Sequence, residues 1–188
     1  MKRILTGVIA TTALLGGIAS APAYASPAGG NAPGRHCVVA PGPSTTCYDT
    51  FREAIRQATG GRVTEAPSDP AVALASAEFA RDINASGLAS DGRAPVSSIE
   101  YENPNHNPAT LTFALGACGS DDSWDYGLSD IDGVDPAWDD RISSYQGYNG
   151  CQVNHYEAPG YRGDRTGYRN SQKDMGSMNN KTSSLRWR

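Results

Sequence analysis

Asp139-Asp140-Arg141-Ile142-Ser143-Ser144 and Asn179-Asn180-Lys181-Thr182-Ser183-Ser184 are two copies of one six-residue pattern. Both follow the order [DN]-[DN]-x-x-[ST]-S, so four of the six positions carry side chains with hard oxygen atoms. Such oxygens are the ligands that Ca²⁺ prefers. A single copy is typical of a solvated turn or a cap, because Asp, Asn and Ser are common turn residues. The second copy makes the pattern informative.

Another repeat precedes each copy. Tyr101-Glu102-Asn103-Pro104 and Tyr156-Glu157-Ala158-Pro159 share Tyr-Glu-x-Pro at an offset of 55 residues. The same offset aligns His106 with Tyr161 and Phe113 with Tyr168, whereas the oxygen-rich stretches lie 40 residues apart. The first copy therefore carries 15 extra residues between Phe113 and Asp139. Two elements that recur in one order indicate a duplicated unit of roughly 40–50 residues.

This two-part pattern resembles the Greek-key motif of the βγ-crystallin family over residues 96–188. The resemblance implies a mainly β fold, in which repeats 96–145 and 151–188 form a β-sandwich of two four-stranded Greek keys. The residues themselves agree, because Tyr, Thr, Val and Trp alternate with polar residues and Gly and Pro recur at short intervals. That alternation predicts short antiparallel strands.

The same resemblance implies a Ca²⁺ site in each repeat. A serine hydroxyl, a backbone carbonyl and oxygens near the second position of the stretch would bind the ion, and the Tyr-Glu hairpin of the partner repeat would complete it. The residues concerned are Ser143 and Ser183 (hydroxyl), Arg141 and Lys181 (carbonyl), Asp140 and Asn180 (second position), and Glu102 and Glu157 (hairpin).

Two departures from the family pattern bear on these sites. Pro108 occupies the position of Gly163, and the family's hairpin uses a glycine there because it needs positive φ. We therefore expect a reshaped first hairpin. Asn179 and Asn180 replace carboxylates, so the second site is expected to be the weaker one unless Glu157 compensates.

The N-terminus has the pattern of a secretory signal peptide over residues 1–25. Lys2 and Arg3 precede an apolar run, and Ala23-Tyr24-Ala25 gives a small-x-small cleavage site. We expect a secreted, extracellular protein that has no membrane segment after cleavage. Cleavage would lower the basic residues from 16 to 14 against 20 acidic ones, a net charge of −6. This charge argues against nucleic-acid binding.

Four cysteines remain, and an even number in an exported chain favours disulfides. Three pairings are possible. We favour Cys37–Cys47, which closes a short loop, and Cys118–Cys151, which links the extra segment to the second repeat. No Cys-x-x-Cys is present, which disfavours a zinc ribbon or thioredoxin-like site.

Between the signal peptide and the repeats we expect a flexible linker over 26–36 and a helical region over 37–95. Thr50-Phe51-Arg52-Glu53 reads as a capping box, and Gly60-Gly61 ends that helix. A second helix is predicted to begin at Ser68-Asp69-Pro70 and to run to residues 84–87, with Val72, Ala75, Phe79 and Ile83 on one face. Such short helices either pack on the β-domain or form a small disulfide-pinned cap.

The sequence shows no catalytic pattern: the three histidines form no His-x-x-x-His pair and there is no Gly-x-Ser-x-Gly. We therefore expect a non-enzymatic, monomeric Ca²⁺-binding module. The alternative is a secreted proteinase inhibitor, since the whole mature chain is similar to exported actinobacterial proteins grouped with the Streptomyces metalloproteinase inhibitors. An extracellular peptidase would then be the partner, and the acidic segment 114–138 the contact loop. A killer-toxin-like role is also known on this fold.

Overall fold

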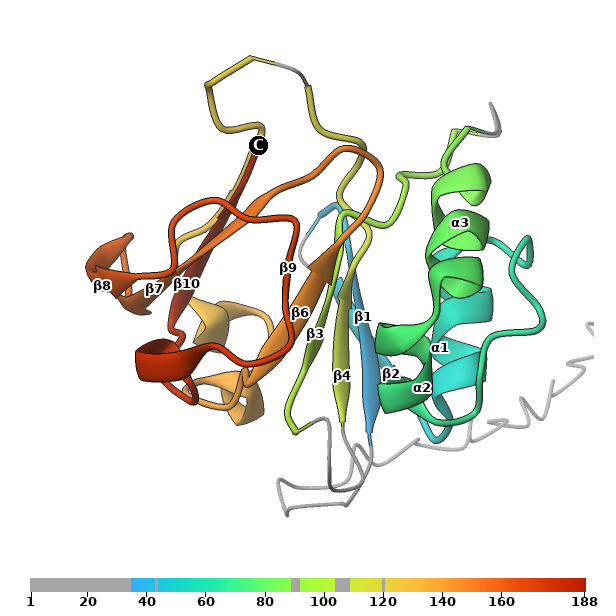
Figure 1. Ribbon diagram of the computed structural model, residues 1–188, viewed down its shortest axis with the longest axis horizontal. Helices are drawn as coiled ribbons and strands as arrows, with labels where there is room; N and C mark the ends of the chain where they lie inside the picture. The colour runs from blue at the N-terminus through green and yellow to red at the C-terminus, as the bar shows by residue number, and fades with distance from the viewer. Residues whose placement is uncertain (1–34, 43, 89–91, 104–108, 120) are drawn as a thin grey trace, which may run out of the picture. The chain divides into compact units, whose positions relative to one another are not determined.

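Two β-sheets form the framework of the described chain (Figure 1). The structure is a computed structural model that describes residues 35–188 except 43, 89–91, 104–108 and 120. The predicted signal peptide 1–25, nearly all of the linker 26–36, and the hairpin residues His106 and Pro108 lie outside the described residues. The prediction of a mainly β protein is confirmed at the level of two sheets and few helices.

The larger sheet, here called sheet A, has six strands in the order β2-β1-β4-β3-β6-β9. Their bounds are β1 His36–Ala40, β2 Ser44–Tyr48, β3 Ser98–Tyr101, β4 Thr110–Phe113, β6 Ser144–Gly147 and β9 Ser171–Gln172. β1 runs parallel to β4, and the other neighbouring strands are antiparallel.

The smaller sheet, sheet B, has four antiparallel strands in the order β5-β10-β7-β8. Their bounds are β5 Tyr126–Leu128, β7 Val153–Ala158, β8 Arg162–Arg165 and β10 Ser184–Trp187. β5 belongs to the first repeat yet pairs with β10, and β9 belongs to the second repeat yet pairs with β6. Each repeat therefore contributes one strand to the sheet that is formed mostly by the other.

The first helix begins where the sequence predicted. Thr50 caps α1 (Phe51–Ala58) by accepting a hydrogen bond from the Glu53 backbone N–H, and positive φ at Gly60 and Gly61 ends it. The carboxylate of Glu53 binds Arg56 and Gln57 rather than completing the box.

The predicted second helix is two helices, α2 (Pro70–Ala75) and α3 (Ala77–Ser86). Ser76 adopts an extended ψ of 113° and its hydroxyl caps α3 by accepting from the Phe79 N–H, which interrupts the helical ladder. The interruption turns Val72 to solvent with 55% of its surface exposed, and Ala73 and Leu74 are buried instead.

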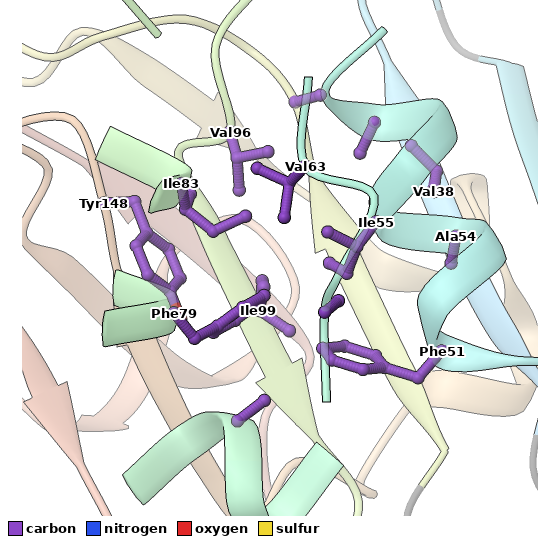
Figure 2. Close-up of a cluster of buried hydrophobic side chains, with 14 of the residues drawn as sticks. Val38, Phe51, Ala54, Ile55, Val63, Phe79, Ile83, Val96, Ile99 and Tyr148 are labelled. Carbon is purple, nitrogen blue, oxygen red and sulfur yellow. The ribbon is translucent and has the colours of Figure 1, made fainter. Parts of the chain in front are cut away.

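Sheet A separates two hydrophobic cores. On one side α1, α2 and α3 pack on Val38, Ile99 and Tyr148, as Figure 2 shows. On the other side Leu111 and Phe113 meet Leu185 and Trp187 of sheet B. Alternate residues of β3 and β4 face opposite sides, as the two-residue period of a strand requires. The predicted packing of the helices against the β-domain is confirmed.

The segment at the start of the predicted helical region 37–95 is a β-hairpin. β1 and β2 pair through residues 36–48, and β1 extends sheet A beside β4. Sheet A therefore has six strands rather than the four expected from the resemblance. Cys37 and Cys47 face each other across the hairpin and form a disulfide.

The second disulfide joins Cys118 and Cys151, so both pairs favoured from the sequence are present. The extra segment 114–138 was expected to be one long loop, and here the structure differs. It holds β5 and the 3₁₀ turns η1 (Ile131–Gly133) and η2 (Pro136–Trp138), with Ile131 and Trp138 buried in the core. Its longest exposed stretch among the described residues is 121–125.

Candidate metal centre

The two oxygen-rich stretches adopt the same backbone conformation. η2 leads into Asp139 in the first repeat, and η3 (Gly176–Met178) leads into Asn179 in the second. The second residue of each stretch is left-handed, with φ of 54° at Asp140 and 55° at Asn180. Asp and Asn tolerate this conformation better than other residues with a Cβ atom. The pattern therefore encodes one turn, used twice.

Backbone hydrogen bonds join the two stretches reciprocally. The N–H of Asp140 donates to the Thr182 carbonyl at 3.2 Å, and the N–H of Asn180 donates to the Ile142 carbonyl at 3.0 Å. The fifth residue of each stretch then joins its own repeat: Ser143 N–H donates to Tyr101 O and Ser183 N–H to Tyr156 O, both at 2.9 Å. The two turns therefore contact each other where the two repeats pack together.

A polar cavity of about 410 Å³ lies beside the first stretch. Inside it the Ser143 hydroxyl donates to Oδ1 of Asn180 at 2.8 Å, so the serine of one repeat meets the amide of the other. The Arg141 guanidinium binds the Glu102 carboxylate. The lining residues are Glu102, Asn103, Asp140, Arg141, Ser143, Lys173, Asp174, Asn179 and Asn180.

The corresponding place in the second repeat brings Asp140 toward Glu157 and Lys181. Lys181 Nζ lies 3.5 Å from Glu157 Oε1. Burial raises the pKa of Asp140, the negative charges of Asp139 and Glu157 raise it further, and Lys181 lowers it. Acidic oxygens therefore gather here, as a cation site requires.

The site residues fit a Ca²⁺ ion by donor type. Ser143 Oγ and Asn180 Oδ1 are 2.8 Å apart, so both could contact one ion at its usual distance of roughly 2.3–2.6 Å. The carbonyl oxygens of Arg141 and Lys181 accept no hydrogen bond from any described residue, which leaves them available as ligands. The side chains of Arg141 and Lys181 each form an ion pair with the glutamate of their own repeat, and a bound cation would compete with them for that carboxylate.

Soft-metal sites have less support among the described residues. One group of three His, Cys, Asp or Glu side chains is close enough to hold an ion, and it consists of Cys37, Cys47 and Asp135. Both of its cysteines are in a disulfide, so neither offers a thiolate ligand.

Each hairpin glutamate forms an ion pair within its own repeat, Glu102 with Arg141 and Glu157 with Lys181. From the resemblance, Glu102 was expected to serve the second repeat and Glu157 the first, and Glu102 does line the cavity together with Asn179 and Asn180 of the second repeat. The second residue of each stretch also crosses, because the reciprocal N–H bonds at positions 140 and 180 bring Asn180 to Ser143.

Three further cavity residues were missed from the sequence: Asn103, Lys173 and Asp174. Asn103 directly follows Glu102 and was detectable by position alone. Lys173 and Asp174 follow β9, and they reach the first repeat's cavity because β9 pairs with β6. The strand exchange that places them there has no local signal in the sequence.

No protein-family model, curated protein or solved structure matches this chain. No helix among the described residues is long and apolar enough to span a membrane.

Proposed function

We propose that this protein is a secreted, non-enzymatic Ca²⁺-binding module built from two Greek keys of the βγ-crystallin type. The observation that carries the proposal is the reciprocal pairing of the two oxygen-rich turns, with the same left-handed residue in each. This pairing brings side-chain oxygen atoms from both repeats together at one place, as at Ser143 and Asn180, and a shared cation site requires such a cluster of oxygen ligands.

Strand order supports the Greek-key part of this proposal. Without β1 and β2, sheet A reads β4-β3-β6-β9 and sheet B reads β5-β10-β7-β8. Each repeat then has four strands, the third of which lies in the other sheet. Neither repeat can bury its apolar face alone under this arrangement. The two disulfides and the N-terminal signal pattern support secretion.

Asp140 bears on both proposed sites. It lines the first cavity together with Glu102 and Asp174, and the charges of Glu157 and Lys181 in the second repeat act on its pKa. Because carboxylates strengthen Ca²⁺ binding and Asn179 and Asn180 are neutral, the first site is proposed to be the tighter one.

The test is a calorimetric Ca²⁺ titration of protein freed of metal with EGTA, followed by melting with and without Ca²⁺. We expect two bound ions, and about 2.7 kcal/mol of stabilisation for each site when free Ca²⁺ exceeds its Kd a hundredfold. Ser143→Arg should remove the tighter site and Ser183→Arg the weaker one, since each puts a cation where an ion would bind. Ser44→Arg, on the exposed strand β2, is the matched control. Identical melts in Ca²⁺ and EGTA would reject the proposal.

The inhibitor alternative now rests on a shorter segment. Residues 119 and 121–125 are exposed and begin directly after the disulfide of Cys118. A covalent anchor of this kind lowers the conformational entropy lost on binding. Assays of metallo- and serine peptidases with the intact protein test this alternative, and inhibition that survives replacement of residues 121–125 by Gly and Ser would exclude the segment as the contact.

A further inference from the structure

The outward face of sheet B carries aromatic rings interleaved with arginines. Leu185 and Trp187 of β10 point into the core and are fully buried, so Arg186 and Arg188 point outward. Trp124, Tyr161 and Tyr168 stand around them. These five residues are called the arginine–aromatic surface below.

Arg186 is held between two rings and has no anionic partner in the part of the chain that the structure describes. Its guanidinium carbon lies 3.9 Å from the centroid of Tyr161 and 5.1 Å from that of Trp124. Its Nε is buried and finds no hydrogen-bond acceptor among the described residues. Arg188 differs, because it reaches Asp122 at 3.4 Å and Gln152 at 3.2 Å. A rigid, unpaired guanidinium is a ready site for an anion.

Tyr161 is placed over Arg186 by local structure. It has φ of 63°, a left-handed conformation that bulky residues rarely adopt, and its N–H donates to the Ser184 hydroxyl at 3.0 Å. A Cβ atom at residue 127 would lie 2.5 Å from the Tyr161 hydroxyl oxygen, so this arrangement requires Gly127. Backbone strain of this kind persists only where surrounding contacts impose it, and it is concentrated at functional sites.

The charge of this part of the chain favours an acidic ligand. Residues 151–188 together with residues 121–125, which supply Trp124, hold seven basic and six acidic residues, a net charge of +1, although the whole chain has a net charge of −4. Trp124 is 51% exposed and lies next to the Arg186 guanidinium. A sugar can lay its C–H face on such a ring while the guanidinium binds a neighbouring carboxylate.

We propose that the arginine–aromatic surface binds an acidic polysaccharide, with Arg186 on a carboxylate and Trp124 on the adjoining sugar ring. The choice of a polysaccharide over other polyanions rests on the proposed secretion, which places the protein among extracellular glycans. The Ca²⁺ turns take no part in this contact.

The test is affinity electrophoresis of the full mature protein in native gels that contain carboxymethyl dextran, or dextran as its uncharged counterpart, with EGTA throughout. We expect retardation by carboxymethyl dextran alone, weakened by added salt. Arg186→Gln should weaken it about tenfold, the worth of one charge-assisted contact. Trp124→Ala, at a half-exposed position, should weaken it without changing the melting temperature. Arg81→Gln, an equal charge change on exposed α3, should leave it unchanged.

Several outcomes would overturn the inference. Equal retardation by dextran, or an Arg186→Gln protein that behaves like Arg81→Gln, would remove the site. Retardation as strong by polyglutamate or by single-stranded oligothymidylate at the same charge concentration would show a general polyanion surface and reject the sugar assignment. Because EGTA is present, a protein that fails to bind Ca²⁺ yet binds the polymer would refute only the Ca²⁺ proposal.

Discussion

A buried polar chain links the two sheets, and breaking it at Glu100 is expected to destabilise the fold. Trp187 Nε1–H donates to Ser98 Oγ at 2.9 Å, Ser98 donates to Glu100 Oε1 at 2.6 Å, and Glu100 Oε2 lies 3.0 Å from His155 Nε2. All four residues are fully buried, and the Tyr145 ring packs on His155 with centroids 4.2 Å apart. Ser98 and Glu100 belong to sheet A, whereas His155 and Trp187 belong to sheet B.

The size of the effect follows from what each substitution leaves unpaired. Glu100→Gln keeps the volume but replaces one acceptor oxygen by an NH₂ group, so one charge-assisted hydrogen bond is lost at about 2 kcal/mol. Glu100→Ala removes both acceptor oxygens and leaves His155 and Ser98 without this partner. Each buried polar group left without a hydrogen-bond partner costs about 1–3 kcal/mol, and two groups are left here. The alanine variant should therefore be the less stable by about 2 kcal/mol.

Urea unfolding followed by tryptophan fluorescence measures both losses, and an unchanged slope with urea would show that a shift of the midpoint reports stability. Thr112→Val is the matched control, because the Thr112 hydroxyl is buried in sheet A without a partner among the described residues. Its removal should change stability by less than about 0.5 kcal/mol or raise it. If Glu100→Gln proved as stable as Thr112→Val, the carboxylate would not hold the chain together and this reasoning would fail.

Two further predictions concern the first strand and the second disulfide. Burial lowers the pKa of His36 to about 4 from 6.5, so unfolding takes up a proton between these pH values, and the free energy of unfolding should fall by up to about 3 kcal/mol as the pH drops from 6.5 to 4. Unfolding curves of wild type and His36→Gln should diverge across that range, and parallel pH profiles would contradict the burial argument. Replacing Cys118 and Cys151 by Ser opens a loop whose ends are 33 residues apart, so the free energy of unfolding, measured by heat or urea, should fall by about 3–4 kcal/mol. A fall of less than about 1 kcal/mol would show that the disulfide constrains the unfolded chain little.

Local patterns in the sequence were sufficient for elements whose causes are local. The Thr50 cap and the glycines at 60 and 61 determine α1 within a dozen residues. The sequence also showed that the turns at 139–144 and 179–184 are equivalent, and their matched φ values agree with this. The break at Ser76 was missed because the apolar spacing continues through it, and only the serine hydroxyl on Phe79 N–H reveals the new helix.

Non-local pairing accounts for what the sequence could not predict. His36 in β1 lies beside Thr110 in β4, 74 residues away, and a parallel partner leaves no turn motif to reveal it. Similarly, Trp124 and Arg186, which lies between the apolar Leu185 and Trp187, look like separate surface residues in the sequence. They become one surface only when β5 pairs with β10.

The candidate Ca²⁺ sites depend on contacts between the repeats that composition alone does not show. Counting charges within each stretch makes the second site the poorer one, because Asn179 and Asn180 are neutral. The backbone N–H groups of residues 140 and 180 each donate to the stretch of the other repeat, so the Asn180 side chain meets Ser143, and the charges of Glu157 and Lys181 act on Asp140. The same two repeats are joined in two ways: they exchange strands β5 and β9, and the second residue of each oxygen-rich stretch reaches the other repeat. Each proposed site therefore exists only when both repeats are folded, and binding at either site must stabilise the pair as one cooperative unit.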